Sequence, residues 1–360
     1  MTRGSKVLVV GLLAVLLAGC GGGSGAKTGG VDPAVIKEVE AEEAAEVKAK
    51  AKAAKKCPAA PGSALDVALD EWENPETAGI LMANKRGYFA DSGLEVSTLA
   101  PPRPGAVIPD VVAGGDAVGI SHEPEVVLAQ EEGEPIVIIG SLISRPTAAL
   151  IWLKKSKIGS ITDLKGKTIA IPGLPFQEQL LEKALAQGGL TLEDVKVESV
   201  ANEVMAHLVG GRADAIFAPR NLRGTELEAR GLEPVIKPVR DFGVPAYGEV
   251  VLIAHAACVS KKPKVFRKFL SALARGTAAA VEDPAGAVKA FETEYETNPE
   301  TGRKALEAQI KATFPLLSRS GYVSPDQAQG LVDWMYEEEM ILHKVPVAKL
   351  LTNRYLPTAP

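Results

Sequence analysis

The chain has 360 residues, of which 46% are hydrophobic and 5% are aromatic, enough to bury one large core or two smaller ones. Its 40 basic and 45 acidic residues leave a net charge of −5, so no overall positive field attracts nucleic acid. The four His and three Cys are too scattered for a zinc or iron–sulfur site, and no Gly-x-x-x-x-Gly-Lys-Ser/Thr phosphate loop occurs. We therefore expect no nucleic-acid partner, no metal and no cofactor.

The N-terminus has the pattern of an export signal. Arg3 and Lys6 precede an apolar run over residues 7–17, too short to span a hydrocarbon core of about 30 Å at about 1.5 Å per residue. The run ends in Leu17-Ala18-Gly19-Cys20, which resembles the lipobox of bacterial lipoproteins, where the Cys is acylated, typically with palmitate. We predict a signal peptide at residues 1–19 and lipidation of Cys20. The alternative is an ordinary export signal with an incidental Cys.

Residues 20–62 have the composition of a spacer. A Gly-rich stretch at residues 21–25 is typical of flexible coil, and Asp32-Pro33 is a helix start. Residues 34–56 are mostly Ala, Glu and Lys, with most acids before most bases, as a helix dipole favours. Because no broad apolar face is present, we expect this helix to be solvated and the spacer to hold a folded body away from a membrane.

From Ala64 onward, short apolar runs alternate with segments of helical period. The runs lie at residues 65–69, 96–99, 118–121, 136–142, 148–153, 169–171, 195–200, 215–218, 235–239 and 250–254. This alternation predicts an α/β protein with open, mostly parallel sheets flanked by helices. Helical patterns then follow at residues 263–282, 284–296, 299–314 and 324–341.

An exported α/β protein with a helical C-terminal third is either a secreted hydrolase or a solute-binding protein. The sequence contains no Gly-x-Ser-x-Gly, Ser-x-x-Lys or His-Glu-x-x-His motif, so the standard exported hydrolases lack their nucleophile or metal box. We therefore expect that the chain is not an enzyme.

Several stretches carry a more specific signal. They are residues 69–75 (LDEWENP), 78–80 (AGI), 85–96 (KRGYFADSGLEV), 119–124 (GISHEP), 161–169 (ITDLKGKTI) with Pro172-Gly173, and 243–251 (GVPAYGEVV). In this order they resemble ABC-transporter substrate-binding proteins of the thiamine-pyrimidine-precursor type. The resemblance implies a two-lobed, type II periplasmic-binding-protein-like fold with a ligand cleft between the lobes. It also implies that residues 161–169 cross between lobes and that residues 243–251 return to the first.

The resulting domain boundaries are lobe 1 at residues 63–147, lobe 2 at 148–246, the rest of lobe 1 at 247–345, and a tail at 346–360. Ligands of open α/β sheets bind beyond the carboxyl ends of strands, where several of the quoted residues fall. Together with the resemblance, this predicts a ligand site formed by Trp72, Asn74, Ser121, His122, Glu123, Gly173, Asn221, Tyr247 and Glu249.

Most of these residues also have a structural alternative. Trp72 can stack on a planar ligand or fill the core, and Asn74 can bind a ring edge or cap a helix. Ser121 and Glu123 can cap a helix and complement its dipole. Glu249 resembles the carboxylate that receives ligand amino groups.

The sequence departs from the family at two places. An aromatic residue is more common where His122 stands, and Arg220 stands where relatives have Trp, so that a cation there admits an anionic group on the ligand.

Cys57 and Cys258 remain once Cys20 is acylated. An exported compartment permits a disulfide, and the two flank strands of the same predicted lobe. The alternative is one free spacer Cys and one buried apolar Cys.

These observations predict a monomeric, lipid-anchored, extracytoplasmic binding protein on the cell membrane. It would capture a small heterocyclic solute, a thiamine-type pyrimidine precursor first, and deliver it to an ABC permease and its ATPase. Riboflavin, a sulfonate such as taurine, and nitrate are alternative solutes. Two alternatives come from other classes: a pyrimidine-synthase-like enzyme and a ligand-sensing ectodomain. The export signal and the missing Cys-rich run argue against the synthase.

If Cys20 carries the lipid, Cys20→Ala should release the protein in soluble form and leave ligand binding unchanged, because the spacer separates the anchor from the folded body. Membrane fractionation measures this. A Cys20→Ala protein that stays with the membrane would contradict the lipobox interpretation.

Overall fold

The structure is a computed structural model that describes residues 56–58, 62–294 and 302–357. The predicted signal peptide, Cys20 and nearly all of the predicted spacer lie outside the described residues. Within the described ranges, no helix is both long and apolar enough to cross a bilayer.

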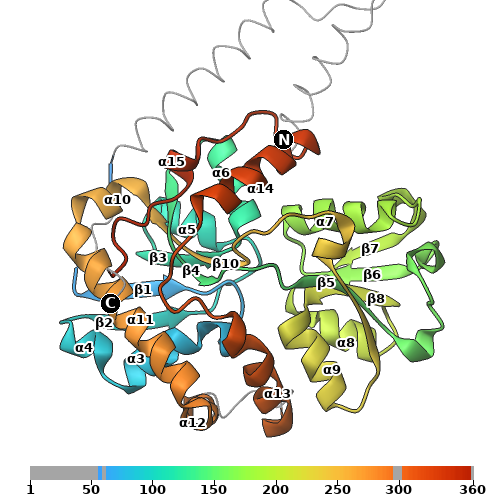
Figure 1. The fold of residues 1–360 in the computed structure, drawn as a ribbon, viewed down its shortest axis with the longest axis horizontal. Coiled ribbons are helices and arrows are strands. Elements are labelled where there is room, and N and C mark those ends of the chain that lie inside the picture. Colours follow the sequence, from blue (N-terminus) through green and yellow to red (C-terminus); the bar gives the residue numbers. More distant parts are fainter. Residues whose placement is uncertain (1–55, 59–61, 295–301, 358–360) are drawn as a thin grey trace, which may run out of the picture. The chain divides into compact units, whose positions relative to one another are not determined.

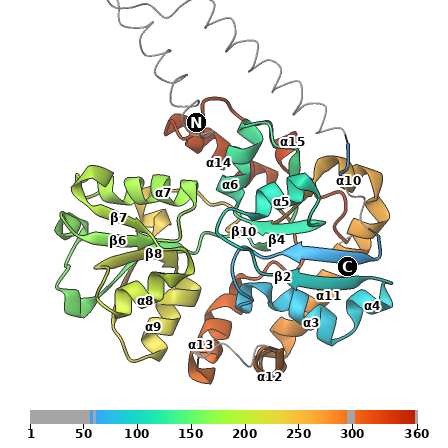
Figure 2. The same cartoon turned by 180° about the vertical axis from the view of Figure 1, so that it is seen from behind.

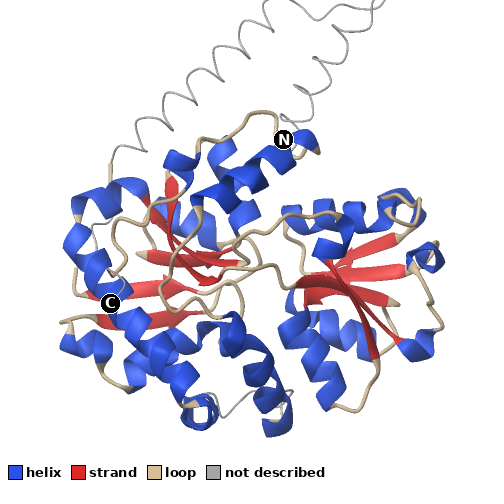
Figure 3. Ribbon diagram, viewed as in Figure 1, coloured by secondary structure: helices blue, strands red, loops and turns tan. Residues whose placement is uncertain are grey.

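Ten strands in the described part of the chain form two five-stranded sheets (Figures 1 and 3). One sheet has the order β2-β1-β3-β10-β4 and defines lobe 1; the other has the order β7-β6-β8-β5-β9 and defines lobe 2. The strands are β1 (Ala64–Ala68), β2 (Glu95–Leu99), β3 (Val118–Ser121), β4 (Ile136–Ile143), β5 (Ala148–Leu153), β6 (Thr168–Ile171), β7 (Lys196–Ser199), β8 (Ala215–Pro219), β9 (Pro234–Pro238) and β10 (Val250–His255). Every predicted strand is present, and the predicted two-lobed α/β fold is confirmed.

Both sheets are mixed: in each, four strands run in one direction and one runs against them, so the expected mostly parallel sheets are present with one antiparallel strand each. In lobe 1, β1 pairs in parallel with β2 and β3, whereas β10 is antiparallel to β3 and β4. In lobe 2, β6 is parallel to β7 and β8, whereas β5 is antiparallel to β8 and β9. The antiparallel strands are the two that enter a sheet directly from the other lobe, without the crossover helix that a parallel connection needs.

The chain crosses between the lobes at residues 144–147, between β4 and β5, and at residues 243–249, between lobe 2 and β10. The return crossing agrees with the prediction. The prediction for residues 161–169 is wrong, because Ile161–Leu164 form a 3-10 turn that leads into β6 inside lobe 2. This segment leads into a strand of the same lobe. The chain has already entered lobe 2 before it, at residues 144–147 ahead of β5.

Helices cover both faces of each sheet (Figures 1 and 2). In lobe 1, α3 (Ala78–Lys85), α4 (Tyr88–Asp91) and α11 (Pro263–Glu282) pack on one face, and α5 (Val107–Ala113), α6 (Glu123–Glu131), α14 (Pro325–Glu337) and α15 (Val347–Leu350) on the other. Lobe 1 also holds α10 (Ala256–Lys261), α12 (Pro284–Glu294) and α13 (Arg303–Thr313). Lobe 2 holds α7 (Pro175–Ala186), α8 (Val204–Val209) and α9 (Thr225–Ala229).

The crossing of α3 and α11 depends on glycine. A Cβ on Gly276 would lie 2.1 Å from the carbonyl oxygen of Gly79, and a Cβ on Gly79 would lie 2.3 Å from Oγ1 of Thr277. Neither contact is sterically allowed, so these two glycines let the helices approach backbone to backbone.

The segment predicted as a tail is part of lobe 1 instead. Leu350 is fully buried, and Leu351 forms a parallel bridge with Ile138 on the edge strand β4. Its apolar side chains therefore cover an exposed sheet edge, which would otherwise present unpaired backbone groups.

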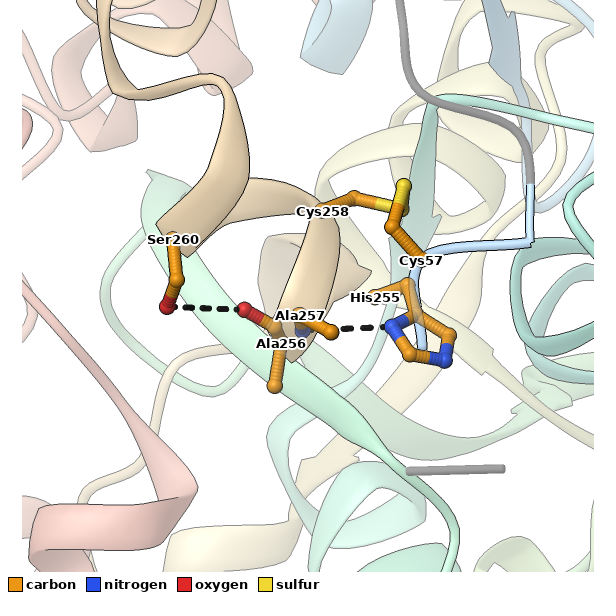
Figure 4. The surroundings of a disulfide bond; sticks show 6 residues. All are labelled: Cys57, His255, Ala256, Ala257, Cys258 and Ser260. Carbon is orange, nitrogen blue, oxygen red and sulfur yellow. Dashed lines mark hydrogen bonds between the residues drawn. A yellow bond between two sulfur atoms is a disulfide. The ribbon is translucent and has the colours of Figure 1, made fainter. Parts of the chain in front are cut away.

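A disulfide joins Cys57 to Cys258 (Figure 4), as one of the two sequence alternatives predicted. Cys258 lies on the short helix α10, whose first turn is capped by His255, with Nδ1 accepting from the Ala257 N–H at 3.2 Å. The bond attaches the residues before β1 to the helix that follows β10, and both sulfur-bearing side chains are buried.

Thiol counting on unreduced, denatured chain lacking residues 1–20 should find no free thiol. Because the disulfide closes a loop of 201 residues, its reduction should lower the free energy of unfolding by about 3 to 5 kcal/mol. A Cys57→Ser/Cys258→Ser double variant should lose the same amount and be insensitive to reductant. Two free thiols in the wild-type chain would contradict the pairing.

Candidate functional site

A narrow cleft of about 50 Å³ lies between the two lobes. Lobe 1 contributes acidic, basic and proline side chains: Asp70, Glu71, Glu76, Pro104, His122 and Glu249. Lobe 2 contributes mainly apolar and amide residues: Ala148, Pro172, Leu174, Phe176, Gln177, Asn202, Phe217, Ala218 and Pro219. The volume accommodates a few water molecules, so a heterocyclic ligand enters only if the lobes or the lining side chains move.

His122 lies at the centre of the lobe 1 wall, at the N-cap of α6. Its Nδ1 is 2.5 Å from the carbonyl oxygen of Glu249, and its Nε2 is 3.6 Å from Oδ2 of Asp70. Burial alone would lower the pKa of His122, but the carboxylates of Asp70 and Glu249 raise it above its ordinary value. The imidazole is thus held as a hydrogen-bond donor between two acids.

Glu249 joins the two crossings. Its Oε2 accepts the backbone N–H of Thr147 at 2.6 Å and that of Ala148 at 3.2 Å, both at the first crossing, while Glu249 itself ends the second. Its Oε1 lies 3.7 Å from Nδ1 of His122. Glu249 therefore lines the cleft as predicted, and it also has a structural task that the sequence did not indicate.

Three further carboxylates face the cleft from the loop after β1. Burial raises the pKa of Asp70, against the opposing charge of His122, and burial likewise raises the pKa of Glu71, against that of Arg223. Burial raises the pKa of Glu76 to about 8, although a hydrogen bond from Asn221 opposes the shift. At neutral pH Glu76 is therefore mainly a neutral acid that can donate as well as accept.

The lobe 2 wall is aromatic. Phe176 lies in the first turn of α7 and Phe217 lies in β8; both are almost fully buried and line the cleft. The Phe176 ring centroid is 5.1 Å from that of His122, at an interplanar angle of 42°. Phe176 was not among the residues predicted to bind the ligand. Its place shortly after the carboxyl end of β6 was the signal that would have identified it.

Trp72 is neither a stacking platform in this cleft nor a core residue, which corrects both predictions. Its side chain is 60% exposed and does not line the cleft. The turn after β1 directs Asp70 and Glu71 inward, and Glu73, next to Trp72, bonds outside the cleft to Thr98 through Oε1 at 2.7 Å. A single turn thus separates the inward acids from the outward indole.

Asn74 takes its structural alternative, whereas Ser121 neither lines the cleft nor caps a helix, because His122 is the N-cap of α6. Asn74 caps the 3-10 turn η1 (Pro75–Thr77), with Oδ1 accepting from the Glu76 N–H at 2.8 Å, and its Nδ2 donates to Oε1 of Glu71 at 2.9 Å. The Ser121 hydroxyl donates to Oε2 of Glu125 at 2.6 Å. Neither Asn74 nor Ser121 lines the cleft. From outside the cleft, Asn74 orients the loop after β1 that carries Asp70, Glu71 and Glu76, here called the acidic loop, through its hydrogen bonds to Glu71 and Glu76.

Glu123, Tyr247 and Gly173 also lie outside the cleft lining. The Glu123 carboxylate accepts the N–H of Gly248, and burial raises its pKa to about 7 against that hydrogen bond. A Cβ on Gly248 would lie 2.8 Å from Val251 and 3.1 Å from Glu123, so glycine is needed for this close approach. Tyr247 is fully buried, and burial next to Glu249 raises its pKa well above its ordinary value. Gly173 adopts a φ of 97° in the turn after β6.

Asn221 is buried at the edge of the cleft rather than in its lining. Its Nδ2 donates to Oε1 of Glu76 at 2.8 Å and to the Thr313 hydroxyl at 3.0 Å. Arg220 does not line the cleft either, so the predicted opening for an anionic group at that position is absent from the described lining. In the described ranges, no group of three or more His, Cys, Asp or Glu side chains is arranged to hold a metal ion.

The buried acids should make stability fall as pH rises. Between the ordinary pKa of about 4.5 and the folded value of about 8, native Glu76 holds a proton that the unfolded chain lacks. Glu76→Gln should therefore flatten the decline in unfolding free energy between pH 5 and 8, by about 2 to 4 kcal/mol. Urea denaturation across this pH range measures the slope.

Glu95→Gln, which removes an exposed carboxylate on β2, is the control and should keep the wild-type slope. A Glu76→Gln slope equal to that of wild type would show that Glu76 ionises normally in the folded protein.

Solved structures share this architecture. The alkanesulfonate-binding protein SsuA from Xanthomonas axonopodis pv. citri, bound to MOPS, superposes with a TM-score of 0.64 at 16% identity, covering 82% of this chain and 99% of that one. A protein from Bordetella bronchiseptica gives a TM-score of 0.69 at 19% identity, covering 82% and 96%. The fold is thus that of periplasmic binding proteins.

One relative is named for thiamine biosynthesis and another for binding a pyrimidine. A "Putative thiamine biosynthesis protein" of Haemophilus influenzae is 31% identical over 77% of this chain and 88% of its own length. A "Formylaminopyrimidine-binding protein" of Halalkalibacterium halodurans is 31% identical over 70% of this chain and 73% of its own length.

Other relatives overturn our expectation that the chain is not an enzyme. A protein of Schizosaccharomyces pombe that is 26% identical over 74% of this chain is named 4-amino-5-hydroxymethyl-2-methylpyrimidine phosphate synthase, and so is one of Legionella pneumophila at 24% over 83%. The absence of hydrolase motifs excluded only the hydrolase chemistries, and relatives of this chain include proteins named as enzymes of another kind.

The family described as "NMT1/THI5 like" matches residues 74–287, which include the acidic loop from Asn74, His122, Phe176, Asn221 and Glu249. The match spans more than half of the chain. The chain therefore belongs to the NMT1/THI5-like family.

Proposed function

We propose that this protein is the extracytoplasmic substrate-binding component of an ABC importer, and that it captures an aminated heterocycle, a thiamine-type pyrimidine precursor, in the interlobe cleft. The observation that carries the proposal is the composition of the cleft. Asp70, Glu71, Glu76 and Glu249 supply its carboxyl groups, and among the lining residues only His122 is basic.

The acidic wall favours ligands that donate hydrogen bonds. A carboxylate accepts from amino and ring N–H groups in charge-assisted hydrogen bonds, which are roughly twice as strong as neutral ones. An anion a few ångströms from a carboxylate is repelled by about 4 kcal/mol at an effective dielectric constant of about 20. The cleft therefore disfavours a sulfonate or nitrate as ligand and favours an aminopyrimidine.

The two walls together suit a planar ring with polar edges. Phe176 and Phe217 offer apolar faces from lobe 2, and the acids and His122 offer acceptors and donors from lobe 1. Closing the lobes buries the ring against both walls at once and excludes water from the hydrogen bonds. The printed name of the Halalkalibacterium halodurans relative, a formylaminopyrimidine-binding protein, supports the same ligand class.

The remaining parts of the proposal come from the sequence. An export signal at residues 1–19 and a lipidated Cys20 would anchor the protein on the outer side of the cell membrane, with the spacer up to residue 62 as tether. The permease and its ATPase would be its partners. A monomer suffices, because the cleft is complete within one chain.

Calorimetry with an aminated pyrimidine, riboflavin, taurine and nitrate tests the ligand class. The aminated pyrimidine should bind most tightly, and Asp70→Asn should weaken it by about tenfold or more, since it removes an acceptor from the His122 cluster. Tight binding of taurine or nitrate, with no binding of the pyrimidine, would overturn the proposal. A synthase-like enzyme would instead form a pyrimidine, so a pyrimidine that mass analysis detects after incubation without added ligand would favour that alternative.

A pair of aromatic variants provides the matched control. Phe176→Leu removes a ring that lines the cleft and should weaken planar ligands by about 1 to 2 kcal/mol. Trp72→Ala removes an exposed ring outside it and should leave the affinity unchanged. The opposite pattern would move the stacking site to Trp72.

A further inference from the structure

The lobes touch beside the cleft, apart from the two crossings. On lobe 2 the contact is made by η6 (Arg220–Gly224), one turn of π-helix, and by α9. On lobe 1 it is made by α13, which packs against both elements, and by Glu76 of η1, which accepts a hydrogen bond from Asn221. Figure 1 shows α13 next to α9 at this side of the molecule. The residues that make these contacts come from sequence positions far apart, so the contact depends on how the lobes are placed.

Arg223 reaches across this contact to a carboxylate of the cleft. Its Nη2 donates to Oε2 of Glu71 at 2.8 Å, and its Nη1 lies 3.6 Å from Oε2 of Glu226 on α9. The Arg223 and Glu71 side chains are 19% and 18% exposed, so little solvent screens the pair. Glu71 itself lines the cleft. A cation of lobe 2 therefore fixes the position of an acid of lobe 1.

Asn221 makes the same kind of connection two residues earlier. Its amide donates to Glu76, which lines the cleft, and to Thr313 at the end of α13. In the opposite direction, Gln309 on α13 donates through Nε2 to the carbonyl oxygen of Leu222 at 3.3 Å. Asn221, Glu76 and Gln309 are all buried.

We propose that η6 of lobe 2 is a positioning element: Arg223 and Asn221 hold Glu71 and Glu76 of lobe 1 in place, so the acidic wall of the cleft is complete only when the lobes are together. The inference rests on the proposed function in taking this wall as the ligand site. Neighbouring carboxylates repel one another, and without lobe 2 nothing among the described contacts of Glu76 other than the Asn74 cap on its backbone N–H restrains it. Closure and the formation of the binding site are then one event.

A consequence for affinity follows. If the binding-competent arrangement exists only in the closed state, the apparent affinity scales with the closed fraction of the ligand-free protein. Arg223 and Asn221 then strengthen ligand binding without contacting the ligand.

Hydrogen–deuterium exchange on the full, ligand-free chain tests the lobe contact directly. Arg223→Gln should speed exchange about tenfold in peptides covering both residues 220–230 and residues 303–316, because parting of the lobes exposes both sides. Arg240→Gln is the control: its Nε lies 3.7 Å from Oδ1 of Asp241 within lobe 2, so it should leave residues 303–316 unchanged. Faster exchange only at residues 220–230, or at neither segment, would overturn the proposal.

A second variant breaks the contact from the other lobe. Gln309→Ala removes the hydrogen bond to Leu222 from α13 and should speed exchange in the same two segments, to a smaller degree. This keeps the test decisive if Arg223→Gln folds poorly.

Ligand affinity separates positioning from the proposed function. Arg223→Gln should weaken the aminated pyrimidine by about tenfold, Arg223→Lys should restore most of that loss, and Arg240→Gln should bind like wild type. Unchanged affinity in Arg223→Gln would overturn the positioning role while the proposed function stands. If the wild type binds no member of the ligand panel, the proposed function fails, and exchange at residues 303–316 still decides whether Arg223 holds the lobes together.

Discussion

The Glu249 carboxylate accepts the backbone N–H groups of Thr147 and Ala148 at the place where both connections between the lobes run side by side. Its own carbonyl oxygen accepts from His122, and the N–H of Gly248, one residue earlier, is taken by Glu123. Without these acceptors, backbone N–H groups of the two short crossings would be buried without hydrogen-bond partners, which is energetically costly. One acidic residue thus fixes how the two sheets join and where the cleft opens.

Fixing the hinge with acids has an electrostatic consequence. Asp70, Glu71, Glu76 and Glu249 come together with one imidazole, and burial raises the pKa of the first three. The protein stabilises this cluster in different ways: Arg223 offsets the charge of Glu71, His122 lies between Asp70 and Glu249, and Glu76 remains largely protonated. Each of these arrangements leaves lone pairs or N–H groups directed at the cleft, which is what a ligand with several donors requires.

The sequence was sufficient for the elements and insufficient for their directions. All ten strands coincide with the predicted runs. The strands β3, β4, β5 and β10 are buried throughout and nearly continuous in apolar residues, whereas the edge strands β2 and β7 are partly exposed. The antiparallel direction of β5 and β10 has no such local signature. It results from the chain entering each of these strands directly from the other lobe. For the same reason a sequence match at residues 161–169 could not distinguish a strand that crosses between lobes from one that begins inside a lobe.

The cleft was predicted at the level of loops and not at the level of side chains. The loops after β1, β3 and β6 and the carboxyl end of β8 do contribute to it, as strand ends of an open α/β sheet should. Within the first loop, however, the turn points Asp70 inward and leaves Trp72 outside, and no spacing rule sets that choice. Phe176 has the apolar period of a core residue, because a cleft wall and a core wall demand the same residue type.

Relatives of this chain bear the names of binding proteins and of synthases, and the groups in this cleft would serve either role. A His N–H oriented by a carbonyl oxygen and next to a carboxylate is a ground-state donor for a bound ring, and it is also a proton donor for a reacting one. The two roles differ in what the protein binds most strongly. An enzyme binds the transition state more strongly than the substrate, whereas a binding protein releases its ligand unchanged. A reversible carrier needs closure to depend on few contacts of moderate strength. The lobe contact through Arg223, Asn221 and Gln309, added to a hinge held by Glu249, has that character: three partly or fully buried polar interactions, which form and break together with the site that they complete.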